Sequence, residues 1–204
     1  MLWQQFGGWW QAQPDPSAPH LKLSFDQPLS NADYPLKPGS ASFYGDSIEF
    51  PFYLLLFPSP NLGDGSGANR PMLQETPDPM TTVMWSSWVE MNPETARNLG
   101  VTTGDIITIS SKAGEVDAIV YEYRGIHPDV LALPLGQGHR AFGRYAQNRG
   151  IKPQDLLFNA ENAAGNLAFM ATRAKVILTG KRTRLTRYES GAGDDLQRSL
   201  FGGI

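Results

Sequence analysis

The 204-residue sequence contains no cysteine and only three histidines. The absence of cysteine excludes disulfide bonds, thiolate nucleophiles and any cysteine-held zinc or iron–sulfur centre within this chain. Because histidine occurs only as His20, His127 and His139, a multi-histidine metal site is also disfavoured. No Gly-x-Ser-x-Gly motif marks a nucleophilic serine, and no pair of carboxylates stands in a catalytic context.

Long apolar runs and a strong excess of one charge are missing as well. No stretch of about 18 apolar residues occurs, and the N-terminus lacks the basic and then apolar segments of a signal peptide. The net charge of −3 gives no general attraction to nucleic acid or anionic lipid. The hydrophobic content of 41% is sufficient for a sizeable core.

The stretch 88–123 organises the chain, and its pattern predicts strand, short helix, strand, tight turn and strand. Asn92 is a good N-cap, and Pro93 suits the first helical position, where its missing N–H costs nothing. Gly100 can adopt the left-handed conformation that ends a helix. The β-branched run 106–109 and the hairpin that follows it are typical of a piece of a small β-barrel.

Other regular elements flank this unit. Apolar runs predict strands at 50–57, 81–91 and 130–135, and a closing strand within 167–178 that is clearest at 174–178. Residues 73–80 are expected to be a short irregular or helical passage, and 150–157 a turn that leads into one helical turn.

The two ends of the chain have a different composition from the middle. Residues 1–48 begin with Trp3, Trp9 and Trp10 and continue as a Pro/Ser/Gly-rich extended arm with a possible strand at 21–25. The tryptophans either pack on the chain's own core or dock into another subunit, since aromatic residues are enriched at interface centres. Residues 181–204 read as a polar tail that needs an outside contact for order.

A glycine-rich loop over 61–70 follows the first strand. Its glycines allow close backbone approach, its N–H groups could face an anion, and Arg70 adds positive charge. The loop lacks the Lys-Ser/Thr ending of a P-loop, and Asp64 adds negative charge. A flexible structural loop and a ligand or subunit contact both remain open interpretations.

A second loop, 136–145, follows a buried strand and combines polar, aromatic and glycine residues. Gln137, His139, Arg144 and Tyr145 could converge as the polar groups of a pocket mouth. The alternative is a polar turn whose side chains bond to neighbouring carbonyl groups. For His127, a local turn with hydrogen bonds inside it is the favoured interpretation.

Five blocks of sequence, taken as a set, match a known pattern. They are Val-Glu-Met-Asn-Pro-Glu-Thr-Ala-Arg-Asn-Leu-Gly-Val-Thr-Thr-Gly-Asp at 89–105, Ser-Ser-Lys-Ala-Gly-Glu-Val at 110–116, His-Pro-Asp-Val-Leu-Ala-Leu-Pro-Leu-Gly-Gln-Gly-His at 127–139, and the runs 63–79 and 142–146. The set resembles the C-terminal dinucleotide-binding domain of the molybdopterin oxidoreductases, the dimethyl sulfoxide reductase superfamily. The last two runs resemble most the large subunit of polysulfide-reductase-like complexes and of alternative complex III.

The resemblance implies a mainly β domain with short helices, a six-stranded double-psi β-barrel over 49–180. It also implies a cofactor, a molybdenum or tungsten bis-pterin guanine dinucleotide, which lies against loops after the barrel strands. By match, the contacting residues would be Asn61, Gly63, Gly65, Gly67, Asn69, Arg70, Gly136, Gln137, Gly138, His139, Arg144, Tyr145 and Asn166. Asn159 is the alternative to Asn166 in the last loop.

Two departures shape the functional expectation. Pro58-Ser59-Pro60 replaces the polar Arg or His-Ser/Thr pattern that many catalytic members carry after the first strand. The alternative complex III branch that the sequence resembles keeps this fold without the pterin. An empty pterin site is therefore one expectation, and a cofactor-clamping domain of a molybdenum or tungsten reductase is the other.

We expect a structural barrel domain, one piece of a split large subunit, in a quinol-linked oxidoreductase complex with no chemistry of its own. The expected partners are the remaining large-subunit domains, an iron–sulfur subunit and an integral membrane quinol-binding subunit. Iron–sulfur clusters and haem are expected only in those chains. The expected location is peripheral on the bacterial cytoplasmic membrane, with the periplasmic side favoured. A stand-alone double-psi barrel that binds a partner protein is the third interpretation.

Overall fold

The computed structural model describes residues 42–161 and 167–188. By its contacts the chain separates into one unit over 1–40 and a second over 41–204, and every described element belongs to the second. The predicted strand at 21–25, the N-terminal tryptophans and Asn166 lie outside the described residues.

The predicted central unit is confirmed. It comprises β2 (Trp88–Met91), α3 (Pro93–Leu99), β3 (Asp105–Ser110) and β4 (Glu115–Glu122). The Asn92 side chain accepts a hydrogen bond from the Glu94 N–H at 2.9 Å, and Pro93 occupies the first turn. Gly100 ends the helix in the left-handed region, at φ 71°. Capping groups read from the sequence thus fix both ends of α3.

Six strands close into a barrel, in the order β1-β5-β2-β4-β3-β6. The remaining strands are β1 (Phe52–Phe57), β5 (Val130–Pro134) and β6 (Arg173–Arg182), and short helices α2 (Pro71–Glu75) and η1 (Pro153–Leu156) lie in the connections. Two pairs are parallel, β1 with β5 and β2 with β4, whereas the other neighbours are antiparallel. Exchanging the first three strands with the last three reproduces the same pairing pattern, so the barrel has two matching, interleaved halves. This is the double-psi arrangement that the resemblance implied.

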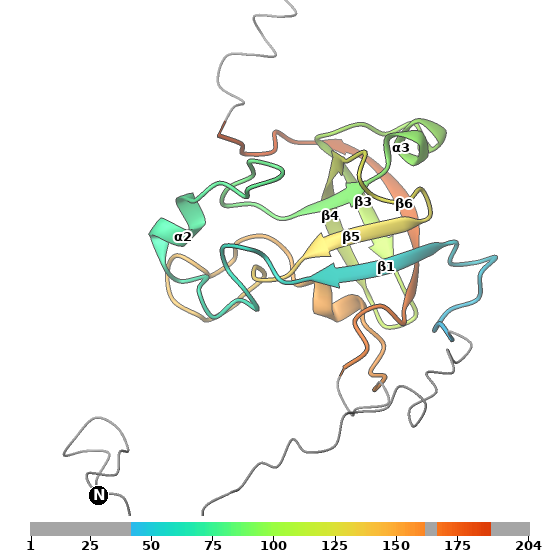
Figure 1. The fold of residues 1–204 in the computed structure, drawn as a ribbon, viewed down its shortest axis with the longest axis horizontal. Helices are drawn as coiled ribbons and strands as arrows, with labels where there is room; N and C mark the ends of the chain where they lie inside the picture. Colours follow the sequence, from blue (N-terminus) through green and yellow to red (C-terminus); the bar gives the residue numbers. More distant parts are fainter. Residues whose placement is uncertain (1–41, 162–166, 189–204) are drawn as a thin grey trace, which may run out of the picture. The chain divides into compact units, whose positions relative to one another are not determined.

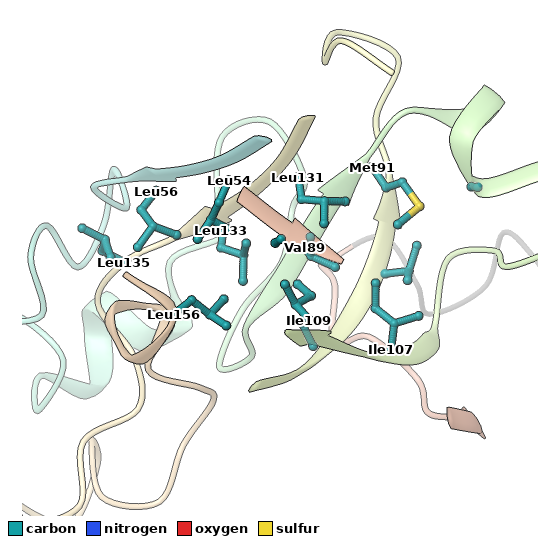
Figure 2. Packing of buried hydrophobic residues seen from close by; sticks show 14 residues of the cluster. Leu54, Leu56, Val89, Met91, Ile107, Ile109, Leu131, Leu133, Leu135 and Leu156 are labelled. Atoms are coloured by element: carbon teal, nitrogen blue, oxygen red, sulfur yellow. The ribbon is translucent and has the colours of Figure 1, made fainter. Parts of the chain in front are cut away.

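The core fills the barrel interior with alternate residues of each strand. Side chains from all six strands and from η1 meet there (Figure 2), because successive residues of a strand point to opposite faces. The fully buried members with the largest side chains are Leu54, Met91, Ile107, Ile109, Leu131, Leu133, Leu156, Val89 and Val120. Burial of one such side chain contributes about 1.5–3 kcal/mol to stability, so the closed core holds the barrel together.

The segment before β2 differs from its prediction. The expected strand over 81–91 is wrong for residues 81–87, and only Trp88–Met91 is a strand. Thr82 and Trp85 adopt positive φ values of 59° and 57°, which break an extended conformation. The polar pattern of this segment serves turns: the Asp78 carboxylate accepts hydrogen bonds from the Met80 and Thr81 N–H groups.

The last strand and the segment after it lie along the barrel. β6 extends to Arg182, well beyond the predicted 174–178. Residues 183–188 then pack on the outside of the barrel, where Leu185 is buried with Val83 and Trp88. The Met84 N–H donates to the Thr186 carbonyl at 3.0 Å, so this part of the C-terminal segment is ordered by the chain itself. Among residues 42–161 and 167–188, no helix is long and apolar enough to cross a bilayer.

Candidate functional site

Two loops meet at one end of the barrel. The first loop (residues 58–70) follows β1 and the second loop (residues 136–150) follows β5. Because β1 and β5 are parallel neighbours, their C-terminal ends lie side by side (Figure 1), beyond which α2 is also found. The α3 helix lies at the opposite end of the barrel. The topology therefore brings together the two stretches that the sequence singled out.

Glycines in each loop make room for a polar side chain of the other. A Cβ atom added to Gly65, where φ is +110°, would stand 2.7 Å from His139 Nε2. A Cβ on Gly143 would collide with the Asn69 side chain, whose Oδ1 atom accepts a hydrogen bond from the Tyr145 N–H at 3.1 Å. These two glycines thus serve the packing of one loop on the other.

The backbone N–H groups of the first loop are mostly used within the loop. Eight of these N–H groups donate hydrogen bonds to oxygen atoms of residues between Ser59 and Gly67. They belong to Ser59, Asn61, Leu62, Gly63, Gly65, Ser66, Ala68 and Arg70. A loop that binds a phosphate through its backbone keeps consecutive N–H groups free and pointing outward. The fold of this loop is a series of tight turns, which does not provide such a cradle.

Asp64 takes part in this internal bonding. Its Oδ1 atom accepts a hydrogen bond from the Ser66 N–H at 3.0 Å. The bonds from Ser66 lower the pKa of the Asp64 carboxyl, so it is negatively charged at neutral pH. A carboxylate at the tip of a glycine-rich loop repels a phosphate, which is a second reason against a backbone phosphate cradle here.

Side chains at this end of the barrel suit an anion better than the backbone does. Arg70, Arg140 and Arg144 are exposed, and the ion pairs found among the described residues do not involve them. His139 Nε2 is buried without a hydrogen-bond partner in the described structure, and its ring lies 4.9 Å from that of Phe142. Guanidinium groups bind phosphate oxygens, and a buried ring nitrogen needs a partner. A pterin dinucleotide therefore fits these side chains, but it does not fit the first loop as a backbone cradle.

A cleft of about 620 Å³ lies beside the second loop. One wall is the second loop around Gly138 and His139, and the other is the outer face of β3 and β4 with Thr108 and Asp117. The polar groups there are partly paired, since the Thr108 hydroxyl donates to Asp117 Oδ1 at 2.6 Å. The cleft shares only these two second-loop residues with the predicted site, and the first loop does not line it.

The predicted site residues therefore divide by role. Asn61 bonds to the Thr76 carbonyl at 2.8 Å, and Gln137 is buried against Gln74, so both have structural contacts. Asn159 is exposed and follows η1, outside the two loops. Gly63, Gly67 and Gly136 belong to the turns that shape the loops. The remaining predicted residues that the structure describes belong to the two loops at this end of the barrel, and their binding role stays a prediction. Asn166 is outside the described residues.

Sequence reasoning missed several contacts that α2 and the segment before β2 make with the second loop and the residue after it. Gln74 on α2 is buried and bonds to Gln137, and the Ser87 hydroxyl accepts a hydrogen bond from the Ile151 N–H at 3.0 Å. Arg149 stacks over the Trp85 ring at 4.4 Å. A helix of five residues is too short to show a hydrophobic period in the sequence. The burial of Gln74 therefore becomes visible only in the fold. His127 is confirmed as a local turn residue, because its Nδ1 atom accepts from the Asp129 N–H at 3.3 Å.

A titratable group with a shifted pKa lies on β2, outside the two loops. Glu90 on β2 is half-buried, and burial raises the pKa of its carboxyl. A hydrogen bond from Trp88 Nε1, at 3.3 Å, opposes this rise in pKa, and the charge of Asp78 adds to it. Within the part of the chain that the structure describes, no three His, Asp or Glu side chains gather as a metal site.

Three curated relatives are similar over part of the chain. The arsenate respiratory reductase molybdopterin-containing subunit ArrA of Shewanella sp. (strain ANA-3) is 31% identical over 144 residues, which are 65% of this chain and 17% of the relative. The menaquinone reductase, molybdopterin-binding-like subunit of Nitratidesulfovibrio vulgaris is 33% identical over 81 residues, 40% of this chain and 12% of the relative. The thiosulfate reductase molybdopterin-containing subunit PhsA of Salmonella typhimurium is 32% identical over 79 residues, which are 38% of this chain and 10% of the relative. This chain thus spans less than a fifth of each relative's length.

A solved structure and a family pattern agree with the fold. The acetylene hydratase of Pelobacter acetylenicus superposes with a TM-score of 0.50 at 14% identity, over 68% of this chain and 21% of that one, which is a likeness of fold alone. Residues 71–154 match the molydopterin dinucleotide binding domain, from α2 through η1. Together with the barrel topology and the similarity to molybdopterin-containing subunits, this match confirms the resemblance of the chain to the dinucleotide-binding domain of the molybdopterin oxidoreductases.

Proposed function

We propose that this domain is a packing domain without a pterin, in a membrane-associated, quinol-linked electron-transfer complex of the alternative complex III type. The single observation that carries the proposal is the internal bonding of the first loop, whose N–H groups from Ser59 to Arg70 donate mainly to the loop itself. Binding of a dinucleotide by this backbone would require those bonds to break, and each exchanged bond contributes about 0.5–1.5 kcal/mol.

The name of one relative supports the quinol-linked part of the proposal. The relative from Nitratidesulfovibrio vulgaris is a menaquinone reductase subunit described as molybdopterin-binding-like. Its similarity to this chain covers 12% of its own length, so the activity of the complete assembly is an inference. The proposed partners are the other large-subunit domains, an iron–sulfur subunit and a quinol-binding membrane subunit, with the complex on the periplasmic side.

The barrel suits a packing role for a physical reason. A closed barrel has no free strand edges, so its outer surface meets neighbours through side chains. The core is complete within the described residues, and the loop end is fixed by the buried contact between Gln74 and Gln137. Such a body keeps its shape while larger electron-carrying subunits dock on it.

The second candidate function is a clamp on a bound pterin guanine dinucleotide. The observation in its favour is that the two loops carry exposed guanidinium groups, Arg70 and Arg144, and also the unpartnered His139 Nε2 atom. In that case the two arginines would hold phosphate oxygens and His139 would bond to a polar edge of the ligand. The molybdenum or tungsten centre of the cofactor would supply redox chemistry, and this chain would only bind and orient the dinucleotide.

Metal and pterin analysis of the native complex separates the two functions. The complex is purified through an affinity tag on this chain, and molybdenum, tungsten and the fluorescence of oxidised pterin are measured. The packing proposal expects neither metal nor pterin in stoichiometric amount. Stoichiometric metal with pterin would establish the clamp, and an Arg70→Ala, Arg144→Ala double variant should then lose pterin. Arg124→Ala is the matched control, because Arg124 is exposed in the turn after β4, at the α3 end of the barrel.

A further inference from the structure

The last strand of the barrel extends beyond its neighbour β1. β6 runs from Arg173 to Arg182, and β3 pairs with it from Lys175 to the end. On the other side of β6, β1 pairs only with the first two residues, Arg173 and Ala174. The ring of strands closes there, and the rest of β6 continues toward the α3 end of the barrel (Figure 1). One edge of this extension has no partner strand among the described residues.

The chain before β1 does not continue the pairing with β6. Pro51, the residue before the strand, has no N–H group to donate to a ladder. The Phe50 N–H donates to the Asp46 carbonyl at 2.8 Å and closes a turn. This turn meets β6 through side chains, since Lys175 Nζ lies 3.1 Å from Glu49 Oε1. The backbone of the segment therefore leaves the second half of β6 unpaired on this side.

The register shows which backbone groups face this side. The Leu54 N–H donates to the Thr172 carbonyl at 3.0 Å, so Thr172 directs its backbone groups at β1. Because the direction alternates along a strand, Val176 and Leu178 face the same side as Thr172, beyond the last residue paired with β1. The residue between them faces β3. We call residues 176–178 the β6 edge, whose N–H and C=O groups can pair with an added extended segment.

A small pocket adjoins the β6 edge. Its volume is about 150 Å³, and Leu178, which is 54% exposed, belongs both to the edge and to the pocket wall. The other lining residues are Gly100, Val101, Asp105, Ile106, Thr179, Gly180 and Lys181. A Cβ atom added to Gly100 or Gly180 would meet nothing within 4 Å, so the space at these glycines is open. A cavity of this volume accommodates a benzene ring, so one large apolar side chain of a docking segment fits it.

The charges around the β6 edge favour an acidic segment from a different polypeptide. Lys181 is exposed, and the ion pairs among the described residues do not include it, whereas Arg182 pairs with Asp105 at 3.3 Å. A carboxylate of the docking segment would therefore find a partner in Lys181. Antiparallel pairing of two copies of the edge, centred on residue 178, sets Lys175 of one copy opposite Lys181 of the other. Like charges opposite each other destabilise a ladder, which disfavours a second copy.

We propose that the β6 edge and its pocket bind an extended segment of another polypeptide of the same complex as an added strand. The segment pairs its backbone with Val176 and Leu178, places one apolar side chain in the pocket and sets a carboxylate beside Lys181. The proposal rests on the proposed packing function, because it needs a complex. The closed ring meets neighbours through side chains, and the extension of β6 adds a backbone contact at the end opposite the two loops.

Hydrogen exchange of single amides tests the added strand directly. The Val176 and Leu178 amides should exchange quickly in the isolated full-length chain and at least about tenfold more slowly in the tagged complex. The Ile177 amide faces β3 and is the internal control, slow in both states. Fast exchange of Val176 and Leu178 in the complex would overturn the proposal.

Exchange in the isolated chain identifies the two other possible occupants. Slow exchange of the Val176 and Leu178 amides at every chain concentration would mean that the chain covers its own edge. Protection that grows with chain concentration would assign the edge to a second copy. Either result overturns the proposal, whereas protection that requires the complex supports it.

Substitutions in the tagged complex test the pocket. Leu178→Glu should lower the co-purifying polypeptides at least about tenfold, because a charge then occupies the place of the apolar side chain. Met72→Glu is the control, since Met72 is 78% exposed on α2 at the opposite end of the barrel, and it should change nothing. Both variants should keep the urea midpoint of the unmodified chain, because both side chains are largely exposed. Unchanged co-purification of Leu178→Glu would overturn the proposal.

A charge reversal tests the acidic character of the segment. Lys181→Glu should lower co-purification about threefold, because it faces the carboxylate of the segment. Lys112→Glu is the matched control, since Lys112 is exposed in the hairpin between β3 and β4, away from the pocket. Equal co-purification of the two variants would contradict an acidic segment at this edge. Stoichiometric pterin would remove the packing function yet leave the protection of the β6 edge as it stands, so the two failures are distinguishable.

Discussion

The side-chain amides of Gln74 and Gln137 bond to each other in both directions. Gln137 Nε2 donates to Gln74 Oε1 at 2.6 Å, and Gln74 Nε2 donates to Gln137 Oε1 at 3.2 Å. Gln74 Nε2 also donates to the Ala68 carbonyl at 2.8 Å, so this buried pair connects α2, the first loop and the second loop. Their 63-residue separation in sequence makes the pair a long-range contact at the base of the candidate site.

Loss of one amide from this pair should destabilise the domain. In Gln137→Leu, Gln74 Oε1 stays buried without a donor, which costs about 1–3 kcal/mol. We expect this loss in the free energy of unfolding measured by urea titration of the chain. The double variant Gln74→Leu, Gln137→Leu removes both amides and should lose less than the sum of the single variants. Strictly additive losses would show that the two amides are not coupled.

Gly65 and Gly63 form a matched pair of glycines in the first loop. Both have positive φ values, +110° and +61°, but a Cβ on Gly65 meets His139, whereas one on Gly63 meets nothing within 4 Å. Gly63→Ala should cost about 1 kcal/mol of stability, from backbone strain alone. Gly65→Ala should cost at least about 1 kcal/mol more, because it also pushes the second loop away. The measurement is urea unfolding, with the His139 ring resonances as a local probe. Equal losses would mean that the loops do not pack as described.

The stability of the barrel depends on pH through the carboxyl of Glu90, whose pKa is raised in the folded state. Since burial raises the pKa of its carboxyl in the folded state above the ordinary 4.5, the folded state binds this proton more tightly than the unfolded state. The stabilisation from this proton is complete below pH 4.5 and is lost as pH rises through the folded-state pKa. Glu90→Gln keeps an acceptor for the Trp88 Nε1 donor and removes the charge. The variant should therefore be more stable than the unmodified chain at pH 7 and equal to it near pH 4, as measured by thermal unfolding. A difference independent of pH would contradict this account.

Local signals predicted the fold where residues act on their own neighbours. Asn92, Pro93 and Gly100 fix α3 through contacts within a few residues, and continuous apolar runs mark β1 and β5. The strand predicted over 81–87 is absent because Thr82 and Trp85 adopt left-handed conformations, which neither residue type favours. The sequence also did not predict the full length of β6. Thr179 and Gly180 lie at an irregularity in the pairing of β6 with β3, and the strand continues beyond it.

The candidate site could be located from the sequence but not interpreted from it. The resemblance implied that both loops contact one cofactor, and the approach of Gly65 to His139 shows that the two loops do lie together. The sequence could not tell whether the first-loop N–H groups face outward, because that depends on turn geometry rather than on glycine content. For the same reason it could not reveal Gln74, whose role exists only in the contact with Gln137.

Asn92 offers a test of the unit that the sequence described best. Its Oδ1 atom caps α3 through the Glu94 N–H, and its Nδ2 atom donates to the Ile126 carbonyl at 2.7 Å, which connects the helix to the turn before β5. Asn92→Ala removes both bonds and should cost about 1–2 kcal/mol in urea unfolding. Asn98→Ala on the exposed side of the same helix is the control and should change stability by less than about 0.5 kcal/mol. If both substitutions had the same small effect, the cap would contribute nothing, and α3 would be held by its other contacts, among them the buried Thr95 and Ala96.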